Sequence, residues 1–288
     1  MNNKQLRTYL LCAFLPAWAL QVLASHFALQ GKTQIFQLIM IAVMFVPLIA
    51  ALLAGVPLKD LGWKPELRKN KGALAAAWLG PALLGALGAA LYYLVLPARL
   101  DLSGAYLKAQ VGESGMEQLA QAGLDLKTYI LVQAAAALTY APFLNTIPAL
   151  GEEIGWRGAL YPALKARLGS AKGRLLGGVI WGAWHWPVMV LAGYEYGLHY
   201  FGAPVLGPLI FCLFTVSAGV FLDHLYEKSR CIWFPALGHG AVNAFAALPC
   251  LLLNPAFADQ QILGPTMGGV LSGLPLLLLA LWLLRKDK

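Results

Sequence analysis

The sequence predicts an all-α integral membrane protein, a polytopic bundle of about eight transmembrane helices. The first observation is composition: 59% of the 288 residues are hydrophobic and 12% are charged, with a mean hydropathy of +0.66. Soluble domains usually carry about 25% charged residues, so the excess apolar surface is expected to face lipid. The second is a series of apolar runs about 20 residues long, the length that crosses a bilayer as a helix. The third is a regular alternation of basic and less basic loops between these runs.

Each apolar run is expected to be a helix. None shows the period-two alternation of a barrel strand, and an open sheet leaves unpaired backbone groups in lipid. No linker is long enough to divide the chain, which predicts one domain over residues 1–288 with a motif-bearing core at about 150–245. The runs lie at roughly 8–29, 34–56, 73–96, 128–150, 174–193, 204–225, 232–254 and 263–284.

Lysine and arginine residues are concentrated in alternate loops. One set of loops holds 17 of the 21 basic residues, whereas the opposite set holds Lys32, Arg99, Lys108 and Lys127. The positive-inside rule then predicts a multi-pass protein of the cell membrane whose N- and C-termini are cytoplasmic. The basic residues are expected to contact the headgroups of membrane lipids, and no nucleic-acid partner is expected despite the net charge of +8. The basic set comprises the N-terminus, 57–72, 151–174, 226–231 and the C-terminal residues Arg285, Lys286 and Lys288.

A double glutamate stands at the cytoplasmic end of the fourth run, in the string GEEIGWRG (151–158). On a helix, Glu153 and Arg157 are four residues apart and form a favourable ion pair, while Glu152 points about 100° away. A carboxylate beside an apolar wall suits a general base. The same spacing also occurs at ordinary charged helix ends, so this motif alone leaves both interpretations open.

A histidine lies deep in the fifth run, in the string WGAWHWP (181–187). Counted from Arg174 at the helical rise, His185 is ~16 Å into the membrane. Trp181 and two further tryptophans surround it in sequence, and Pro187 is expected to bend the helix there. The alternative is a core histidine that makes one hydrogen bond between helices.

The string HGAVN (239–243) places a histidine and an amide near the start of the seventh run. His239 and Asn243 share one helix face, and His239 lies ~12 Å from Cys231. Together they supply two hydrogen-bond donors, as an oxyanion site requires, although a polar contact between helices is the simpler alternative. The three polar motifs, at 151–158, 181–187 and 239–243, are all predicted to be accessible from the cytoplasmic side of the membrane. By contrast, Tyr194 fits an aromatic belt at the membrane interface.

Taken in order, these three strings resemble the motifs of the CPBP family of intramembrane proteases. That family includes the eukaryotic type II CAAX prenyl endopeptidases and bacterial relatives linked to bacteriocin self-immunity. Its motifs are EExxxR, FxxxH and HxxxN, and the resemblance covers about 150–245. One departure is Trp181, which stands where the family has phenylalanine and keeps an aromatic wall.

The resemblance implies a role for each matched residue. Glu152 corresponds to the glutamate that activates water, and His185 to the histidine that helps to position it. Glu153 and Arg157 correspond to the pair that shapes the helix end. His239 and Asn243 correspond to the residues that stabilise the oxyanion.

The mechanism has two versions at this point. The favoured one uses no cofactor, because His239 and Asn243 make a better donor pair than ligand pair. In the other, His185, His239 and Glu152 bind Zn²⁺, although the HExxH spacing is absent.

The favoured function is an endopeptidase that cuts a C-terminal or membrane-proximal peptide segment entering from the cytoplasmic side. The CAAX relatives accept prenylated C-termini, but the motifs alone do not carry that specificity over to this chain. One alternative is a proton-coupled transporter, against which the lack of internal repeats counts. Another is a non-catalytic scaffold or bacteriocin immunity protein, against which the intact double glutamate and both histidines count.

Overall fold

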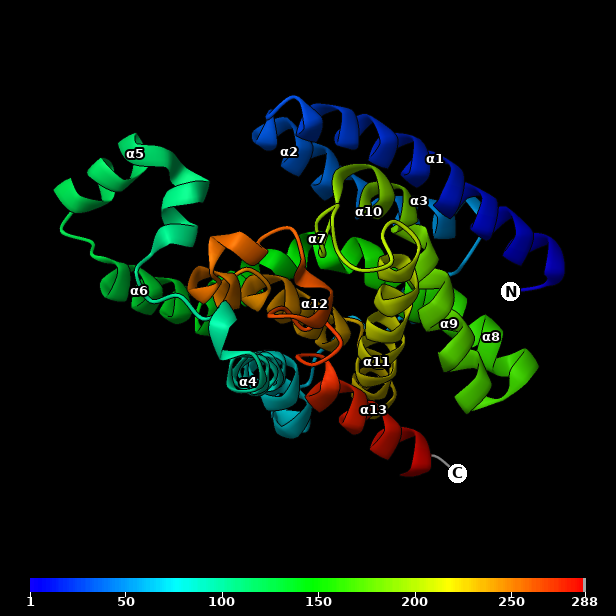
Figure 1. Cartoon of the computed structure of the whole chain (residues 1–288). Helices are drawn as coiled ribbons and strands as arrows, with labels where there is room; N and C mark the ends of the chain where they lie inside the picture. Colours follow the sequence, from blue (N-terminus) through cyan, green and yellow to red (C-terminus); the bar gives the residue numbers. More distant parts are fainter. Residues whose placement is uncertain (287–288) are drawn as a thin grey trace.

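Helices form nearly all of the secondary structure in the computed structural model, which describes residues 1–286 (Figure 1). Within that range no strand occurs, so the all-α prediction is confirmed, and Lys288 lies outside the described residues. The helices are α1 (Asn3–Leu29), α2 (Thr33–Val43), α3 (Val46–Leu53), α4 (Lys71–Val95), α5 (Ala105–Gln121), α6 (Leu126–Leu138), α7 (Ala141–Gly155), α8 (Tyr161–Leu168), α9 (Ser170–Trp184), α10 (Trp186–Ala192), α11 (Leu206–Ser229), α12 (Trp233–Phe245) and α13 (Leu274–Lys286).

Six segments of residues 1–286 are long and apolar enough to cross a membrane as helices. A seventh is added if α6 and the segment Ala141–Leu168, which meet at a bend of 52°, count as one span. These seven segments correspond to the first seven predicted runs, with ends that differ by at most five residues except in the fourth, which continues to Leu168 instead of ending at 150. The six are Asn3–Leu29, Thr33–Leu53, Lys71–Val95, Ser170–Ala192, Leu206–Ser229 and Trp233–Leu252.

The eighth predicted span, 263–284, is only half helical. Helix α13 covers its last part with 13 residues, too short to be a spanning helix by itself. The preceding segment turns at Gly264, whose φ of +144° is a conformation that residues with a side chain rarely adopt. Pro265 follows and has no N–H to donate to a helix. Glycine and proline therefore replace the first half of the expected helix with an irregular segment.

Several predicted runs contain a break beside a proline, among them the fourth, which divides into α6 and α7 just before Pro142. The second run divides into α2 and α3 just before Pro47, and the fifth divides into α9 and α10 just before Pro187. Proline lacks an N–H and its ring displaces the preceding turn, so a helix does not continue through it unchanged. His185 lies at the break in the fifth run, between the end of α9 and the start of α10.

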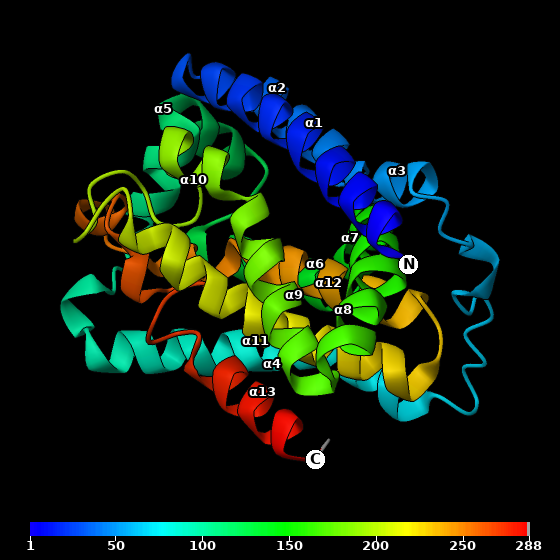
Figure 2. The ribbon, with the colours of Figure 1, turned by 90° about the vertical axis from the view of Figure 1, so that its right-hand side faces the viewer.

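The basic loops gather at one end of the bundle and the other loops at the opposite end. At the first end, Nη2 of Arg167 donates to the carbonyl oxygen of Met1 over 2.9 Å. At the second, the Asn254 N–H donates to the carbonyl oxygen of Arg99 over 2.8 Å. Figure 2 shows the N-terminus towards the right and α5 towards the left. The alternation of loops read from charge agrees with this arrangement.

Candidate active site

Glu152 and Glu153 are adjacent near the end of α7 and have separate partners. Oε2 of Glu152 accepts hydrogen bonds from the indole N–H of Trp156 at 2.9 Å and of Trp181 at 2.8 Å. Oε1 of Glu153 accepts from Nη1 of Arg157 at 2.8 Å. Successive residues of a helix point about 100° apart, which sends the two carboxylates to different neighbours. Both glutamates are buried, with exposed fractions of 2% and 0%.

Arg157 is fully enclosed although it carries a charge. It lies in a π-helical turn, Trp156–Leu160, which continues α7; turns of this kind are frequent at functional sites. Its guanidinium lies over the rings of Tyr161 and Trp181, 4.6 and 4.7 Å from their centroids. Its Nε and Nη2 atoms have no hydrogen-bond partner among residues 1–286. The two aromatic faces offset part of that cost through cation–π attraction.

His239 on α12 connects to the same carboxylate as Arg157. Its Nδ1 lies 2.9 Å from Oε1 of Glu153, and its ring meets that of Trp181 edge-on with centroids 5.3 Å apart. Helices α7 and α12 approach closely at Gly240 of α12, where a Cβ would lie 2.6 Å from the carbonyl oxygen of Pro142 on α7. Glycine at this position therefore allows α12 to bring His239 to Glu153.

His185 is held in place by its position at the break between α9 and α10. Its Nδ1 lies 3.0 Å from the carbonyl oxygen of Trp181, one turn earlier. Its ring packs against Trp184 and Phe211, with centroids 4.9 and 5.0 Å away. The ring of Tyr194 lies nearly parallel to it, at 6.4 Å and 13°. These contacts on several sides fix the imidazole ring.

A cavity of about 60 Å³ brings the predicted residues of α9 and α12 together. His185, His239, Asn243 and Trp181 all line it, and Asn243 is partly buried one turn after His239. Glu152 does not line this cavity and is linked to it through the indole of Trp181. The volume accommodates a few water molecules beside these polar groups.

Glu195 is a cavity residue that the sequence analysis missed. It comes from the loop between α10 and α11 and accepts a hydrogen bond from the hydroxyl of Thr266 in the irregular segment before α13. Burial raises the pKa of the Glu195 carboxyl, and the bond from Thr266 opposes that rise. One signal was present in the sequence, because Glu195 is the only acidic residue between Arg157 and Asp223. The ring of Tyr194, which the sequence predicts in an interfacial belt, lies nearly parallel to the ring of His185.

A second buried charge cluster lies next to the site, at the basic end of the bundle. Asp223 on α11 accepts from Lys165 at 2.8 Å and from Nε of Arg174 at 2.6 Å. Glu227, one turn later, pairs with the same two cations. Arg174 and Asp223 are fully buried. The ion pairs of Lys165 and Arg174 with Asp223 connect α8 and α9 to α11. The two basic residues therefore stabilise helix packing in addition to contributing to the loop charge pattern.

The residues do not form the alternative zinc site. Within residues 1–286, no three His, Cys, Asp or Glu side chains are placed to hold a metal ion. The set His185, His239 and Glu152 is therefore not gathered as a zinc centre within these residues.

Comparison with known proteins bears on this region of the chain. Residues 134–245, which contain α7 to α12 and all three motifs, match the family model described as type II CAAX prenyl endopeptidase Rce1-like. A curated relative, CAAX prenyl protease 2 of Methanococcus maripaludis, is 32% identical over 89 residues, which are 31% of this chain. The match spans 32% of that relative, about a third of its length. Through this motif-bearing region, the chain resembles the Rce1-like type II CAAX prenyl endopeptidases.

Proposed function

We propose that this chain is an intramembrane endopeptidase that hydrolyses a peptide bond in a membrane-associated substrate. The observation that carries the proposal is the buried Glu152 carboxylate, which two indole N–H groups hold beside the cavity lined by His185, His239 and Asn243. The match of residues 134–245 to the family model supports the same activity. Since the curated relative is named a CAAX prenyl protease, a prenylated C-terminal peptide is the first substrate class to test.

In the proposed reaction, Glu152 is the general base. Both indole N–H groups donate to Oε2, so Oε1 accepts the proton of a water oriented by Nε2 of His185. The water oxygen then forms a bond to the carbonyl carbon of the substrate. The C–N bond breaks as the tetrahedral intermediate collapses, and the leaving amine takes the proton from Glu152. Atoms and charge balance without a further reactant.

His239 and Asn243 stabilise the oxyanion in this proposal. His239 donates to Glu153 through Nδ1, so it donates to an oxyanion through Nε2 only when both ring nitrogens carry protons. The resulting imidazolium faces the carboxylate of Glu153, which is a favourable pairing. Asn243, one turn later on α12, supplies a second donor from its side-chain amide.

We further propose that both termini and the basic loops are cytoplasmic, so that the substrate enters from the cytoplasmic side. The distribution of Lys and Arg supports this orientation. The contacts that gather these loops at one end of the bundle support it as well, among them the bond from Arg167 to Met1. A cysteine-labelling experiment on the 57–70 and 97–104 loops in sealed vesicles tests the orientation.

A comparison of protein termini tests the activity before any substrate is identified. Membrane fractions from cells that express the wild type or Glu152→Gln are compared by mass spectrometry of protein termini. The expected result is a set of new C-termini that appear with the wild type and are absent with the variant. Purified protein in nanodiscs is then given the identified peptide, with and without a prenyl group.

The variant must remain folded for this comparison to be valid. Glutamine keeps an oxygen that accepts the indole hydrogen bonds, so Glu152→Gln is expected to unfold within a few degrees of the wild type. Cleavage by a folded Glu152→Gln protein would eliminate Glu152 as the base. Identical termini in both membrane fractions would overturn the protease assignment.

A further inference from the structure

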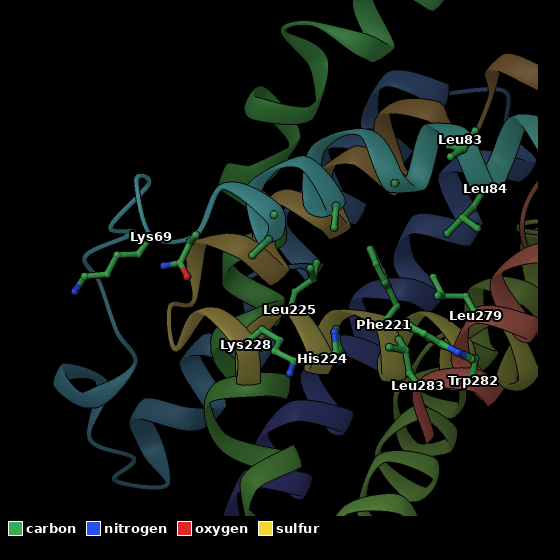
Figure 3. Close-up of a pocket in the computed structure, with 15 residues that line it drawn as sticks. Lys69, Leu83, Leu84, Phe221, His224, Leu225, Lys228, Leu279, Trp282 and Leu283 are labelled. Carbon is green, nitrogen blue, oxygen red and sulfur yellow. The ribbon is translucent and has the colours of Figure 1, made fainter. Parts of the chain in front are cut away.

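A groove of about 580 Å³ lies on the opposite side of α11 from the candidate active site. Its walls come from α4, α11 and α13 (Figure 3). Phe221 and Leu225 of α11 face this groove, whereas Leu222 of the same helix faces the active-site cavity. The volume is in the range of pockets that hold a small-molecule ligand, and the proposed reaction does not use it.

The groove is apolar along most of its length and basic at one end. Figure 3 shows Lys69 at the left, Lys228 and then His224 nearer the centre, and the apolar residues Leu84 and Leu279 towards the right. No acidic residue is among the residues that line it. A second groove of about 300 Å³, on α4, α7 and α12, has no charged residue in its lining. The basic end thus distinguishes the first groove from this second one.

The dimensions match one leaflet of a bilayer. Along α4, Asn70 at the basic end and Leu83 at the apolar end are separated by ~20 Å at the helical rise. Half of the hydrocarbon thickness is ~15 Å. The basic end lies beside the 57–70 loop at the end of the bundle where basic loops gather, which corresponds to the headgroup level. The apolar part then extends into the hydrocarbon.

We propose that this groove binds one anionic phospholipid, with an acyl chain between α4, α11 and α13 and its phosphate at Lys69 and Lys228. Charge complementarity argues for an anionic headgroup, because lysines near a membrane surface attract anionic lipids by about fivefold in affinity each. Lys69 now pairs with Glu66 at 3.0 Å, but both side chains are largely exposed, and such a pair contributes little. Lys69 is therefore free to turn to a phosphate at small cost.

The experiment measures retained lipid by native mass spectrometry. Wild-type protein is released from nanodiscs of equimolar phosphatidylglycerol and phosphatidylcholine, and the bound lipids are identified. The wild type is expected to retain one phosphatidylglycerol in preference to phosphatidylcholine. The double variant Lys69→Gln/Lys228→Gln is expected to reduce that preference by roughly 25-fold, about fivefold for each lysine.

Two further variants separate charge from shape. The control Lys64→Gln/Lys172→Gln removes two exposed basic residues of the same end that do not line the groove, and it is expected to keep the preference. Gly72→Phe places a ring in the groove mouth, where a Cβ meets no atom within 4 Å, and it is expected to lose the retained lipid with both lysines present.

Several results would overturn the proposal. One is an unchanged preference for phosphatidylglycerol in Lys69→Gln/Lys228→Gln. Another is a loss of that preference in Lys64→Gln/Lys172→Gln as large as in Lys69→Gln/Lys228→Gln. A third is a dimer that Gly72→Phe dissociates, because a second copy of the chain would then occupy the groove. Displacement of the lipid by a farnesylated peptide at one-to-one ratio would instead make the groove a substrate site. The measurement does not depend on catalysis, so Glu152→Gln is expected to bind lipid as the wild type does. Failure here and failure of the protease assignment are thus distinguishable.

Discussion

Nδ1 of His239 lies 2.9 Å from Oε1 of Glu153, although 86 residues of chain separate them. The same oxygen accepts a hydrogen bond from Nη1 of Arg157 at 2.8 Å. One carboxylate oxygen thus joins the end of α7 to α12 inside the bundle. Since all three groups are buried, a change in any of them leaves a polar partner without compensation.

Removal of Arg157 is expected to destabilise the fold strongly. Arg157→Met removes the cation that pairs with the buried Glu153 carboxylate and leaves His239 as its remaining partner, which costs about 3–5 kcal/mol. The double variant Glu153→Gln/Arg157→Met removes both charges and is expected to recover more than half of that loss. Thermal unfolding in detergent measures both. Lys69→Met, which breaks the exposed pair with Glu66, is the matched control and should cost less than about 1 kcal/mol.

Trp181 is expected to contribute to the reaction through its indole N–H. Trp181→Phe keeps an aromatic ring and removes the 2.8 Å hydrogen bond to Glu152. Hydrogen bonds to charged groups contribute about 1.5–3 kcal/mol, so kcat is expected to fall about 10- to 100-fold as the carboxylate loses its orientation. Steady-state kinetics on the peptide found by the terminus comparison measure this. A Trp181→Phe protein with wild-type kcat would show that Trp156 alone positions Glu152.

Gly240 is expected to tolerate no larger side chain. Gly240→Val forces α12 away from α7, because its Cβ would lie 2.6 Å from the carbonyl oxygen of Pro142. Such overpacking typically costs about 1–3 kcal/mol, and activity should fall further as His239 moves from Glu153. Gly72→Val is the control, since a Cβ there meets nothing within 4 Å. Equal unfolding temperatures for the two variants would contradict the close approach of the helices.

Glu195 is expected to make stability depend on pH. Burial raises its pKa above the ordinary value of 4.5, so the folded state holds the proton more tightly than the unfolded state. The contribution of the Glu195 carboxyl to the free energy of unfolding is then fully present below pH 4.5 and is lost as the pH rises through the folded-state pKa. Glu195→Gln does not titrate. The melting temperature of Glu195→Gln minus that of the wild type should therefore be larger at pH 8 than at pH 5.

A difference in melting temperature that stays constant from pH 5 to pH 8 would contradict this account. Asp101 provides a control, because Ser103 lowers the pKa of its carboxyl through hydrogen bonds in the 97–104 loop. Asp101→Asn is expected to show no gain between pH 5 and pH 8, since Asp101 is already ionised in both states throughout that range.

The helical class, the first seven membrane segments and the gathering of basic loops at one end followed from the sequence. These features depend on composition and on spacing along the chain, which are local. The prediction of a helix over 263–284 was wrong for its first half, because Gly264 and Pro265 interrupt the apolar run. A count of apolar residues over 20 positions does not register two residues that break a helix.

The sequence by itself determined which side chains are available for chemistry and which of them share a helix face, such as Glu153 with Arg157 and His239 with Asn243. Only the tertiary structure decided that Glu153 holds His239 while Glu152 is held by Trp156 and Trp181. The physical reason is that a partner on another helix is set by how closely two helices pack and in what register. Glycines such as Gly240 permit that approach, but a single helix does not encode which neighbour it meets.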